Sequence, residues 1–233
     1  MRLPVAVLAG GLASRLGPFT TEMPKCLLDV AGRPFIHTQL HQLSSQGVHR
    51  VVLCLGHLGE QVVEAVGDGS AFGLEVVYSF DGPELRGTAG AVKRALPLLG
   101  HAFFVLYGDS HLECNYTAVQ NVFEAAGKLV LMTVFRNEDQ WDTSNVEYRD
   151  GRIVAYDKTN RTVGMQHIDY GLGVWNHHAF EGVPEAGSCD LASVCQEMLL
   201  RGELAGFEVT ERFYEIGSFT GLAETRKHLA GRF

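Results

Sequence analysis

PVAVLAGGLASRLGPFTTEMPKCLLDVAGRP, residues 4–34, begins with a continuous apolar run and then changes abruptly to glycine at Gly10 and Gly11. Such a run is typical of a strand buried on both faces of a sheet. Glycines let backbone N–H groups approach an anion closely, and successive N–H groups form a concavity that binds phosphate. Downstream, Arg15 can grip phosphate oxygens bidentately and Lys25 adds a mobile point charge. The segment therefore predicts a phosphate-binding loop after a buried strand.

Two common phosphate-binding loops do not match this segment. It lacks the G-x-G-x-x-G pattern of a dinucleotide-binding loop and the G-x-x-x-x-G-K-[ST] pattern of a P-loop. A glycine turn followed by two solvated basic residues is the alternative interpretation. The strand before the glycines and the Pro-Lys pair after them favour the phosphate site.

Apolar runs alternate with amphipathic stretches through the first half of the chain. Thr88 can act as the N-cap of the third helix in this pattern. Strands and helices in alternation with short connections predict a parallel sheet with helices on both faces. We therefore expect an α/β fold of three layers with a mainly parallel, Rossmann-like central sheet. The strands are expected at 4–9, 50–55, 74–78 and 102–106, and the helices at 35–46, 58–66 and 88–99.

The second half of the chain has a different pattern, which is richer in strands. Asp150-Gly151 is a hairpin turn signal, Asp190 can cap a helix, and Ser218 can open a last helix. We expect this half to add a small β excursion to a single domain, residues 1–233. The strands are expected at 129–135, 145–148, 152–156 and 168–175, with two more within 206–216 and a helix at 190–200.

The composition is that of an ordinary globular chain and limits its partners. The formal net charge of −8 argues against nucleic acid, because such partners usually demand a basic face. The five cysteines include no C-x-x-C pair, so they suggest neither a disulfide framework nor a zinc site. No apolar run approaches the ~20 residues of a membrane span, and a signal peptide is not expected. We expect a cytoplasmic monomer or homodimer without membrane attachment.

The opening motif resembles that of the sugar-nucleotidyltransferase family, the nucleotide-sugar pyrophosphorylases. The family pattern reads approximately L-A-G-G-x-G-T-R-L-x-P-L-T, followed by P-K. The match covers 8–11, Arg15-Leu16, Pro18, Thr20 and Pro24-Lys25, while Ala13-Ser14 replaces the usual Gly-Thr. The resemblance implies that Arg15 and Lys25 neutralise the triphosphate and are catalytic. It also implies that the nucleotide contacts Leu8, Ala9, Gly10 and Gly11.

Two further motifs follow in the family's order. Residues 86–91 resemble the family's P-L-G-T-A-G segment, and Gly87 and Thr88 would contact the nucleoside at a helix N-terminus. Helix capping by Thr88 is the alternative interpretation. Asp109 follows a predicted parallel strand, where ligands of α/β folds bind. It resembles the aspartate of the family's G-D motif, which implies a nucleotide-binding residue and a ligand of Mg²⁺, an ion that prefers carboxylates and substrate phosphates.

The acceptor side shows weaker matches. Lys158 corresponds to the lysine of the family's E-K-P segment, which implies contact with the sugar phosphate, although a surface turn lysine is a serious alternative. Asp169 and Gly171 resemble the N-A-G-I-Y segment that lines the sugar site; a strand glycine at a bulge is the alternative for Gly171.

Glu215 is the largest departure from the family pattern. It stands where W-x-D-x-G-T has its aspartate, the second metal ligand. Glutamate keeps the charge but is one methylene longer, and Mg²⁺ is exacting about geometry. The resemblance therefore implies a shifted Mg²⁺ site at Asp109 and Glu215, or a displaced helix.

The resemblance implies an enzyme that joins an NTP and a sugar 1-phosphate, giving an NDP-sugar and pyrophosphate, without a C-terminal β-helix. The segments at 32–57 and 168–175 are most similar to heptose 1-phosphate guanylyltransferases, which favours GTP and a D-glycero-D-manno-heptose 1-phosphate. The short length also resembles that of the N-acetylmuramate 1-phosphate uridylyltransferases. The alternatives are a uridylyl- or cytidylyltransferase with another phosphorylated acceptor, and a non-catalytic relative that binds nucleotide sugars.

Overall fold

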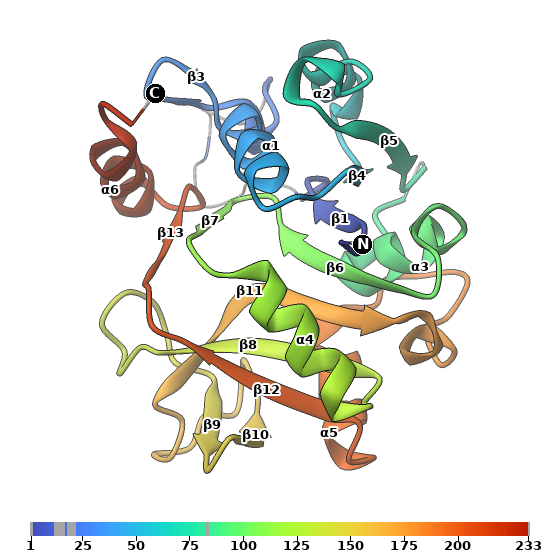
Figure 1. Ribbon diagram of the computed structural model, residues 1–233, viewed down its shortest axis with the longest axis vertical. Coiled ribbons are helices and arrows are strands. Elements are labelled where there is room, and N and C mark those ends of the chain that lie inside the picture. Colours follow the sequence, from blue (N-terminus) through green and yellow to red (C-terminus); the bar gives the residue numbers. More distant parts are fainter. Residues whose placement is uncertain (1, 12–16, 18–21, 83, 233) are drawn as a thin grey trace.

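The computed structural model describes residues 2–11, 17, 22–82 and 84–232. Within them, strands from both halves of the chain form one nine-stranded mixed sheet (Figure 1). The path β10-β9-β11-β6-β1-β4-β5 runs across it, and β8 pairs with β11 and β12. The strands are β1 (Val5–Leu8), β4 (Arg50–Leu55), β5 (Glu75–Phe80), β6 (Ala102–Tyr107), β8 (Val130–Arg136), β9 (Val146–Arg149), β10 (Arg152–Tyr156), β11 (His167–Asn176) and β12 (Leu204–Val209).

Strand β1 lies at the centre of the parallel part. Val5 is opposite Val51 of β4 on one side and Phe104 of β6 on the other, and both pairs are parallel. Among the described strands, β10 and β11 run against the rest of the sheet. The expected mainly parallel, Rossmann-like sheet is therefore confirmed, and the strands of the second half extend it.

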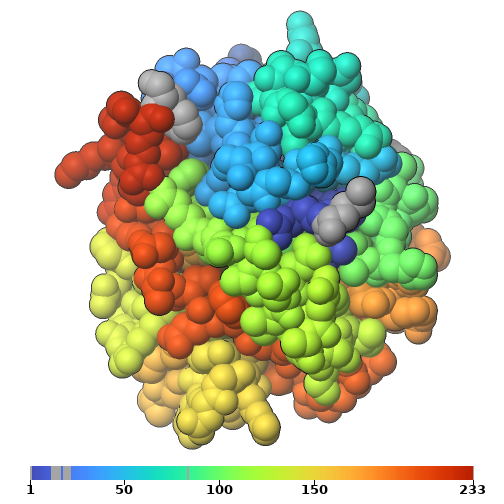
Figure 2. Space-filling view, viewed as in Figure 1, coloured from blue at the N-terminus to red at the C-terminus, as the bar shows by residue number. Residues whose placement is uncertain are grey.

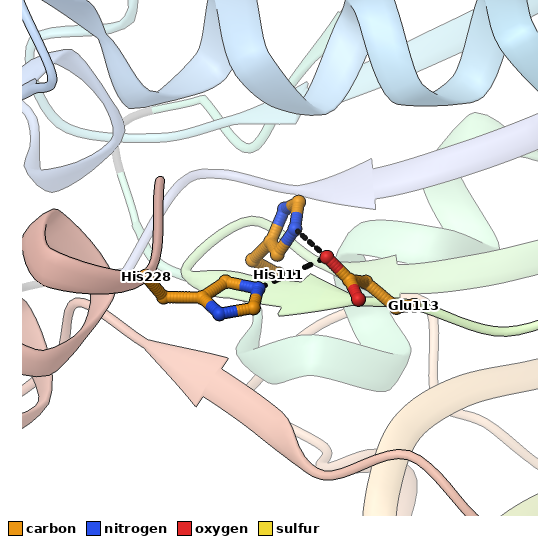
Figure 3. A group of neighbouring side chains, drawn as sticks. All are labelled: His111, Glu113 and His228. Carbon is orange, nitrogen blue, oxygen red and sulfur yellow. Dashed lines mark hydrogen bonds and ion pairs between the residues drawn. The ribbon is translucent and has the colours of Figure 1, made fainter. Parts of the chain in front are cut away.

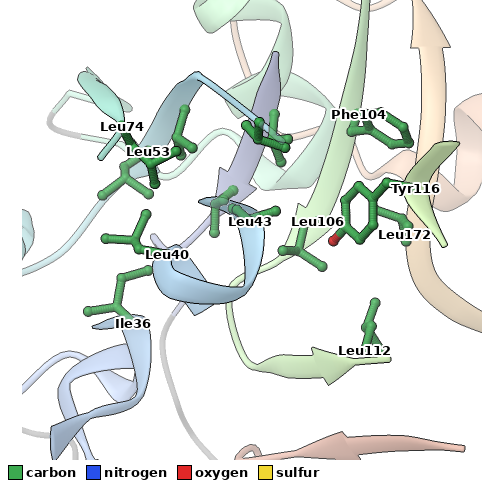
Figure 4. Close-up of a cluster of buried hydrophobic side chains, with 14 of the residues drawn as sticks. Ile36, Leu40, Leu43, Leu53, Leu74, Phe104, Leu106, Leu112, Tyr116 and Leu172 are labelled. Carbon is green, nitrogen blue, oxygen red and sulfur yellow. The ribbon is translucent and has the colours of Figure 1, made fainter. Parts of the chain in front are cut away.

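Alternation along β1 divides the core into two layers. Val5 and Val7 face one cluster, and Ala6 between them faces the other. The first cluster, part of which Figure 4 shows, includes side chains of α1, α2 and α4. The second includes α3 and α5. Helices thus cover both faces, as the three-layer prediction requires. The bounds of these helices are α1 (Phe35–Ser45), α2 (Gly59–Val66), α3 (Gly87–Leu99), α4 (Tyr116–Ala126) and α5 (Leu191–Leu200). Helix α6 (Phe219–Leu229) instead packs in a separate small cluster with Leu28 and Val30.

In the described part of the chain, two short ladders lie outside the main sheet: β2 (Asp29–Val30) with β3 (Arg33–Pro34), and β7 (Ser110–Leu112) with β13 (Phe213–Glu215). The second ladder matters for the site, because it pairs Glu215 with Ser110, next to Asp109. Helix α6 then packs beside β2, and the Arg226 Nε donates to the Asp29 carbonyl at 3.0 Å. Figure 2 shows the C-terminal residues in red beside the early part of the chain in blue.

The N-termini of α3 and α5 cap each other, which differs from the sequence expectation. Thr88 and Asp190 were expected to cap their own helices. Asp190 does occupy the N-cap position of α5, but its side chain makes no capping hydrogen bond there. Instead, the Leu191 N–H donates to the Thr88 hydroxyl at 2.8 Å, and the Thr88 N–H donates to the Asp190 carboxylate at 3.3 Å. Helix α3 already begins at Gly87, so Thr88 lies inside its first turn. The two polar side chains therefore join helices that are about a hundred residues apart in the chain.

Other local signals were correct. Asp150 and Gly151 both have positive φ, as a tight hairpin turn between β9 and β10 requires. Ser218 is the N-cap of α6, and its hydroxyl accepts from the Gly221 N–H at 2.9 Å. Among the described residues, none of the helices has the length and apolar character needed to cross a bilayer.

Candidate active site

A pocket of about 480 Å³ opens where β5, β4, β1 and β6 end. This is the edge where ligands bind in open α/β sheets, at the point where the strand order reverses between β1 and β6. Its volume suits a small organic ligand. Nine of the residues singled out in the sequence line this pocket: Leu8, Ala9, Gly10, Gly11, Lys25, Gly87, Thr88, Asp109 and Lys158. Arg15 lies outside the described residues, so its role stays a prediction.

The two glycines after β1, Gly10 and Gly11, differ in how closely their surroundings pack against them. A Cβ at Gly10 would lie 2.6 Å from the backbone nitrogen of Gly56, so only glycine lets this loop pack against the end of β4. A Cβ at Gly11 would meet nothing within 4 Å. The loop is therefore closely packed on one side and open toward the pocket on the other.

Lys25 and Asp109 form an ion pair inside the pocket. Lys25 begins the short 3-10 helix η2 (Lys25–Leu27), whose Cys26 is buried and anchors it. Its Nζ lies 2.7 Å from the Asp109 Oδ2. Asp109 follows β6, and its Oδ1 accepts from the Ser110 hydroxyl at 3.3 Å. Both side chains are partly exposed to the pocket, so each can contact a ligand.

The Glu215 carboxylate lies beside this ion pair. A Cβ built on Gly217 would be 2.7 Å from the Glu215 Oε2, 3.3 Å from the Asp109 Oδ2 and 3.4 Å from the Lys25 Nζ. Two carboxylates and one ammonium thus converge around a single point. Carboxylate oxygens together with substrate phosphates are the donor set that Mg²⁺ prefers, so these residues fit the metal that the motifs imply.

Glu215 also caps the N-terminus of α6. Its Oε2 accepts from the N–H groups of Gly217 and Ser218, the latter at 3.1 Å, and its Oε1 accepts from the Ser218 hydroxyl. A carboxylate at this position satisfies free N–H groups and opposes the positive end of the helix dipole. The side chain fits because residue 221 is glycine, where a Cβ would lie 1.7 Å from the Glu215 Oε1.

The acceptor residues form a second polar group beside Tyr107. The Asp169 Oδ2 accepts from the hydroxyls of Tyr107 and Tyr156 at 3.2 and 3.3 Å, and the Lys158 Nζ lies 3.8 Å from it. Burial and the Asp169 charge raise the pKa of both tyrosines, so their hydroxyls stay protonated and donate. Gly171 has φ +92 and lies where the register between β11 and β8 shifts. It is therefore a strand glycine at a bulge, which was the alternative interpretation of this residue. Asp169 and Gly171 line a small cavity that shares Tyr107 with the main pocket.

Asp81 is a pocket residue that the sequence analysis missed. Asp81 follows β5 and is only 6% exposed, and it lines the pocket together with Cys54 and Leu85. Its Oδ2 accepts from the Arg86 N–H at 3.3 Å, and burial raises the pKa of its carboxyl. The signal was present in the sequence, because Asp81 lies three residues after the predicted strand 74–78, just as Asp109 lies three residues after the predicted strand 102–106.

The model of the nucleotidyl transferase family matches residues 5–230, almost the whole chain and all of the pocket. The chain belongs to the nucleotidyl transferase family. It is 31% identical to the N-acetylmuramate alpha-1-phosphate uridylyltransferase of Neisseria meningitidis serogroup B, over 97% of each chain. It is 28% identical to the D-glycero-alpha-D-manno-heptose 1-phosphate guanylyltransferase of Campylobacter jejuni, over 68% of this chain and 70% of that protein. The resemblance inferred from the motifs, to enzymes that act on sugar phosphates, is confirmed.

Solved structures share the fold. HddC from Yersinia pseudotuberculosis, crystallised with GMP-PN, superposes with a TM-score of 0.80 at 21% identity, covering 97% of this chain and 99% of that chain. The inositol-1-phosphate CTP transferase of T. maritima superposes with a TM-score of 0.78 at 22% identity, covering 99% and 98%. Sequence identities this low establish only the fold, so the substrates have to be inferred from the residues of the site.

Proposed function

We propose that the protein transfers a nucleotidyl group from an NTP to a sugar 1-phosphate and releases pyrophosphate. The observation that carries the proposal is the convergence of Glu215 with Lys25 and Asp109, two residues that line the pocket. In this reaction an oxygen of the sugar phosphate forms a bond to the α-phosphorus. The bond from that phosphorus to the bridging oxygen of the β-phosphate breaks, and pyrophosphate leaves with those electrons.

The residues of the pocket provide positioning and charge. The acceptor phosphate is already ionised at neutral pH, so the reaction needs no general base, and alignment with charge neutralisation lowers the barrier. Lys25, with Arg15, neutralises the triphosphate, and Lys158 holds the acceptor phosphate near Asp169. Asp109 and Glu215 would hold Mg²⁺, which when bound supplies positive charge to the phosphate oxygens.

A substrate panel tests this function directly. Four NTPs are combined with several sugar 1-phosphates and Mg²⁺, and pyrophosphate release is measured. We expect release only with a matched pair of substrates. Nucleotide-sugar binding without pyrophosphate release from any pair would instead identify a non-catalytic relative.

We further propose that the nucleotide is GTP, with a heptose 1-phosphate as the acceptor in the cytoplasm. Guanine has two adjacent hydrogen-bond donors, N1–H and the N2 amino group, and a single carboxylate can accept a hydrogen bond from each of them. Asp81 supplies such a carboxylate in the pocket wall, close to the first turn of α3. Uracil offers a single ring N–H between two carbonyl oxygens, which a carboxylate repels. The similarity to the heptose 1-phosphate guanylyltransferase agrees with this choice.

A uridylyltransferase is the second candidate. It is favoured by the similarity to the N-acetylmuramate enzyme, which covers 97% of each chain. The same panel separates the two, because GTP with a heptose 1-phosphate and UTP with N-acetylmuramate 1-phosphate are different pairs.

The substitution Asp81→Asn is expected to change which base is accepted. The amide keeps one acceptor and gains a donor, so it matches xanthine, which has N1–H next to a C2 carbonyl. Losing the paired contact to guanine should lower kcat/KM for GTP by about 5- to 140-fold, which corresponds to about 1–3 kcal/mol. The rate with XTP should rise relative to GTP. Asp68→Asn, on the exposed surface, is the matched control. If the ratio of the rates with GTP and XTP is the same in the variant as in the wild type, Asp81 does not take part in base recognition.

Replacing Glu215 with glutamine should raise the Mg²⁺ concentration needed for half-maximal rate by about 10-fold or more, the range seen when a metal site loses a supporting group. Glu215→Asp should also change the titration, or the preference between Mg²⁺ and Mn²⁺, because the carboxylate retracts from Asp109. Glu211→Gln, four residues earlier and exposed, is the control. If both Glu215 variants titrate like the wild type, Glu215 acts only as a helix cap.

A further inference from the structure

Two histidines and a glutamate meet between β7 and the end of α6 (Figure 3). We refer to His111, Glu113 and His228 as the His-Glu-His cluster. The Glu113 Oε1 lies 2.9 Å from the His228 Nε2 and 3.4 Å from the His111 Nε2. One ligand atom from each residue falls within 4.8 Å of the others. None of the three lines the nucleotide pocket, so the cluster is separate from it.

The cluster is partly shielded from solvent. The His111 side chain is 6% exposed and the His228 side chain 14%, while Glu113 is 34% exposed. Tyr214 stacks on the His228 ring at 3.7 Å with an interplanar angle of 14°, which fixes the direction of that ring. The histidine nitrogens are therefore held toward Glu113, and the glutamate leaves one side open.

The spacing of these atoms suits a small tetrahedral ion. Zinc binds histidine nitrogen and carboxylate oxygen at about 2.0–2.2 Å, which places neighbouring tetrahedral ligands about 3.3 Å apart. The two observed distances, 2.9 and 3.4 Å, lie on either side of this value. Imidazole favours zinc, nickel and copper, whereas magnesium favours oxygen ligands. The cluster thus has a different metal preference from Asp109 and Glu215.

We propose that the His-Glu-His cluster binds one divalent ion of the zinc class, with His111, Glu113 and His228 as its protein ligands. Two histidines and one carboxylate leave a fourth position for water. The cysteine pattern does not bear on this site, because none of its ligands is a cysteine.

Arg232 competes with the ion for Glu113. Its guanidinium contacts the same Oε1 that faces both histidines. Its side chain is 47% exposed, so it can move away when a metal ion supplies the positive charge instead. The structure therefore predicts that removing Arg232 leaves metal affinity unchanged or raises it, whereas removing any of the three ligands lowers it.

An ion at this cluster would join α6 to β7. His228 lies in the last turn of α6, and His111 lies in β7, which pairs with β13. Because the ion binds the folded chain, it should raise the unfolding temperature as its concentration increases.

The experiment uses the full chain after treatment with a chelator. Co²⁺ is titrated while its visible d–d absorption is recorded, and Zn²⁺ binding is measured by calorimetry. We expect one ion per chain with the intense absorption of tetrahedral Co²⁺. His228→Ala and Glu113→Gln should each weaken binding by at least about 10-fold, the lower end of the effect of losing even a supporting group. Arg232→Ala should bind as well as the wild type or better.

Two controls make the result decisive. His178→Ala removes an exposed histidine that also pairs with a glutamate, Glu181, and should leave Zn²⁺ binding unchanged. Asp109→Asn should retain binding, because the proposed ligands lie elsewhere. Melting curves without metal establish that each variant is folded, and Glu113→Gln preserves side-chain size. The proposal is wrong if the wild type binds no stoichiometric ion, if folded Glu113→Gln binds like the wild type, or if only Asp109→Asn loses binding.

Discussion

Replacing Lys25 with alanine is expected to lower kcat for pyrophosphate release by at least about 100-fold, the effect of losing one preorganised charge donor. The Lys25 Nζ lies 3.4 Å from the point around which Asp109 and Glu215 converge, so it is placed to meet phosphate charge that develops during transfer. The substitution also leaves the Asp109 carboxylate without its ammonium partner, which should further repel a triphosphate. Steady-state rates over a range of NTP concentrations separate the loss in kcat from a rise in KM.

Lys93→Ala is the matched control for this variant. Lys93 is also a lysine with an 18% exposed side chain and an acidic partner, Glu185, but it does not line the pocket. It should therefore retain the wild-type rate. Equal rates for Lys25→Ala and the wild type would contradict the role assigned to Lys25.

Changing Asp109 to asparagine should abolish most of the activity, again by about 100-fold or more. Asparagine has the same shape and can still accept a hydrogen bond from Lys25, so the fold should be preserved. What it loses is the negative charge with which Asp109 would hold Mg²⁺. Raising the Mg²⁺ concentration should recover only a small part of the rate. The measurement is pyrophosphate release over a Mg²⁺ titration.

Asp150→Asn provides the comparison, because it makes the same change in an exposed hairpin turn that asparagine tolerates well. Its titration should coincide with the wild type. An active Asp109→Asn enzyme with a normal Mg²⁺ requirement would exclude Asp109 as a metal ligand. If Asp109→Asn is inactive while both Glu215 variants behave normally, Asp109 alone holds the metal.

The parallel half of the fold could be predicted because its signals are local. The strand at 50–55 coincides with β4, and helix 35–46 exceeds α1 by a single residue. Each is a short apolar run or a helical repeat with a clear boundary. The local sequence pattern therefore predicts which residues are buried in or against the sheet. Helix α4 was not among the expected elements. Its signals were present, since Asn115 caps it and Tyr116, Val119 and Phe123 share its buried face.

The sequence could not predict which distant segments of the chain come into contact. Glu215 reaches Asp109 only because β13 pairs with β7, across about a hundred residues. The exchange of caps between Thr88 and Asp190 has the same origin, because a capping residue acts on whichever free N–H groups the fold brings near. The family resemblance supplied residues for the pocket, but the hydrogen bonds to Tyr107 and Tyr156 that orient Asp169 required the folded chain.

The contact between Glu215 and Gly221 has a consequence for how this site can evolve. Any side chain at position 221 would occupy the space of the glutamate carboxylate, since a Cβ there falls 1.7 Å from its Oε1. The same Cβ would also lie 2.8 Å from the backbone carbonyl oxygen of Glu215, so placing aspartate at position 215 would not make room for it. Position 221 is therefore expected to stay glycine whichever acidic residue occupies position 215.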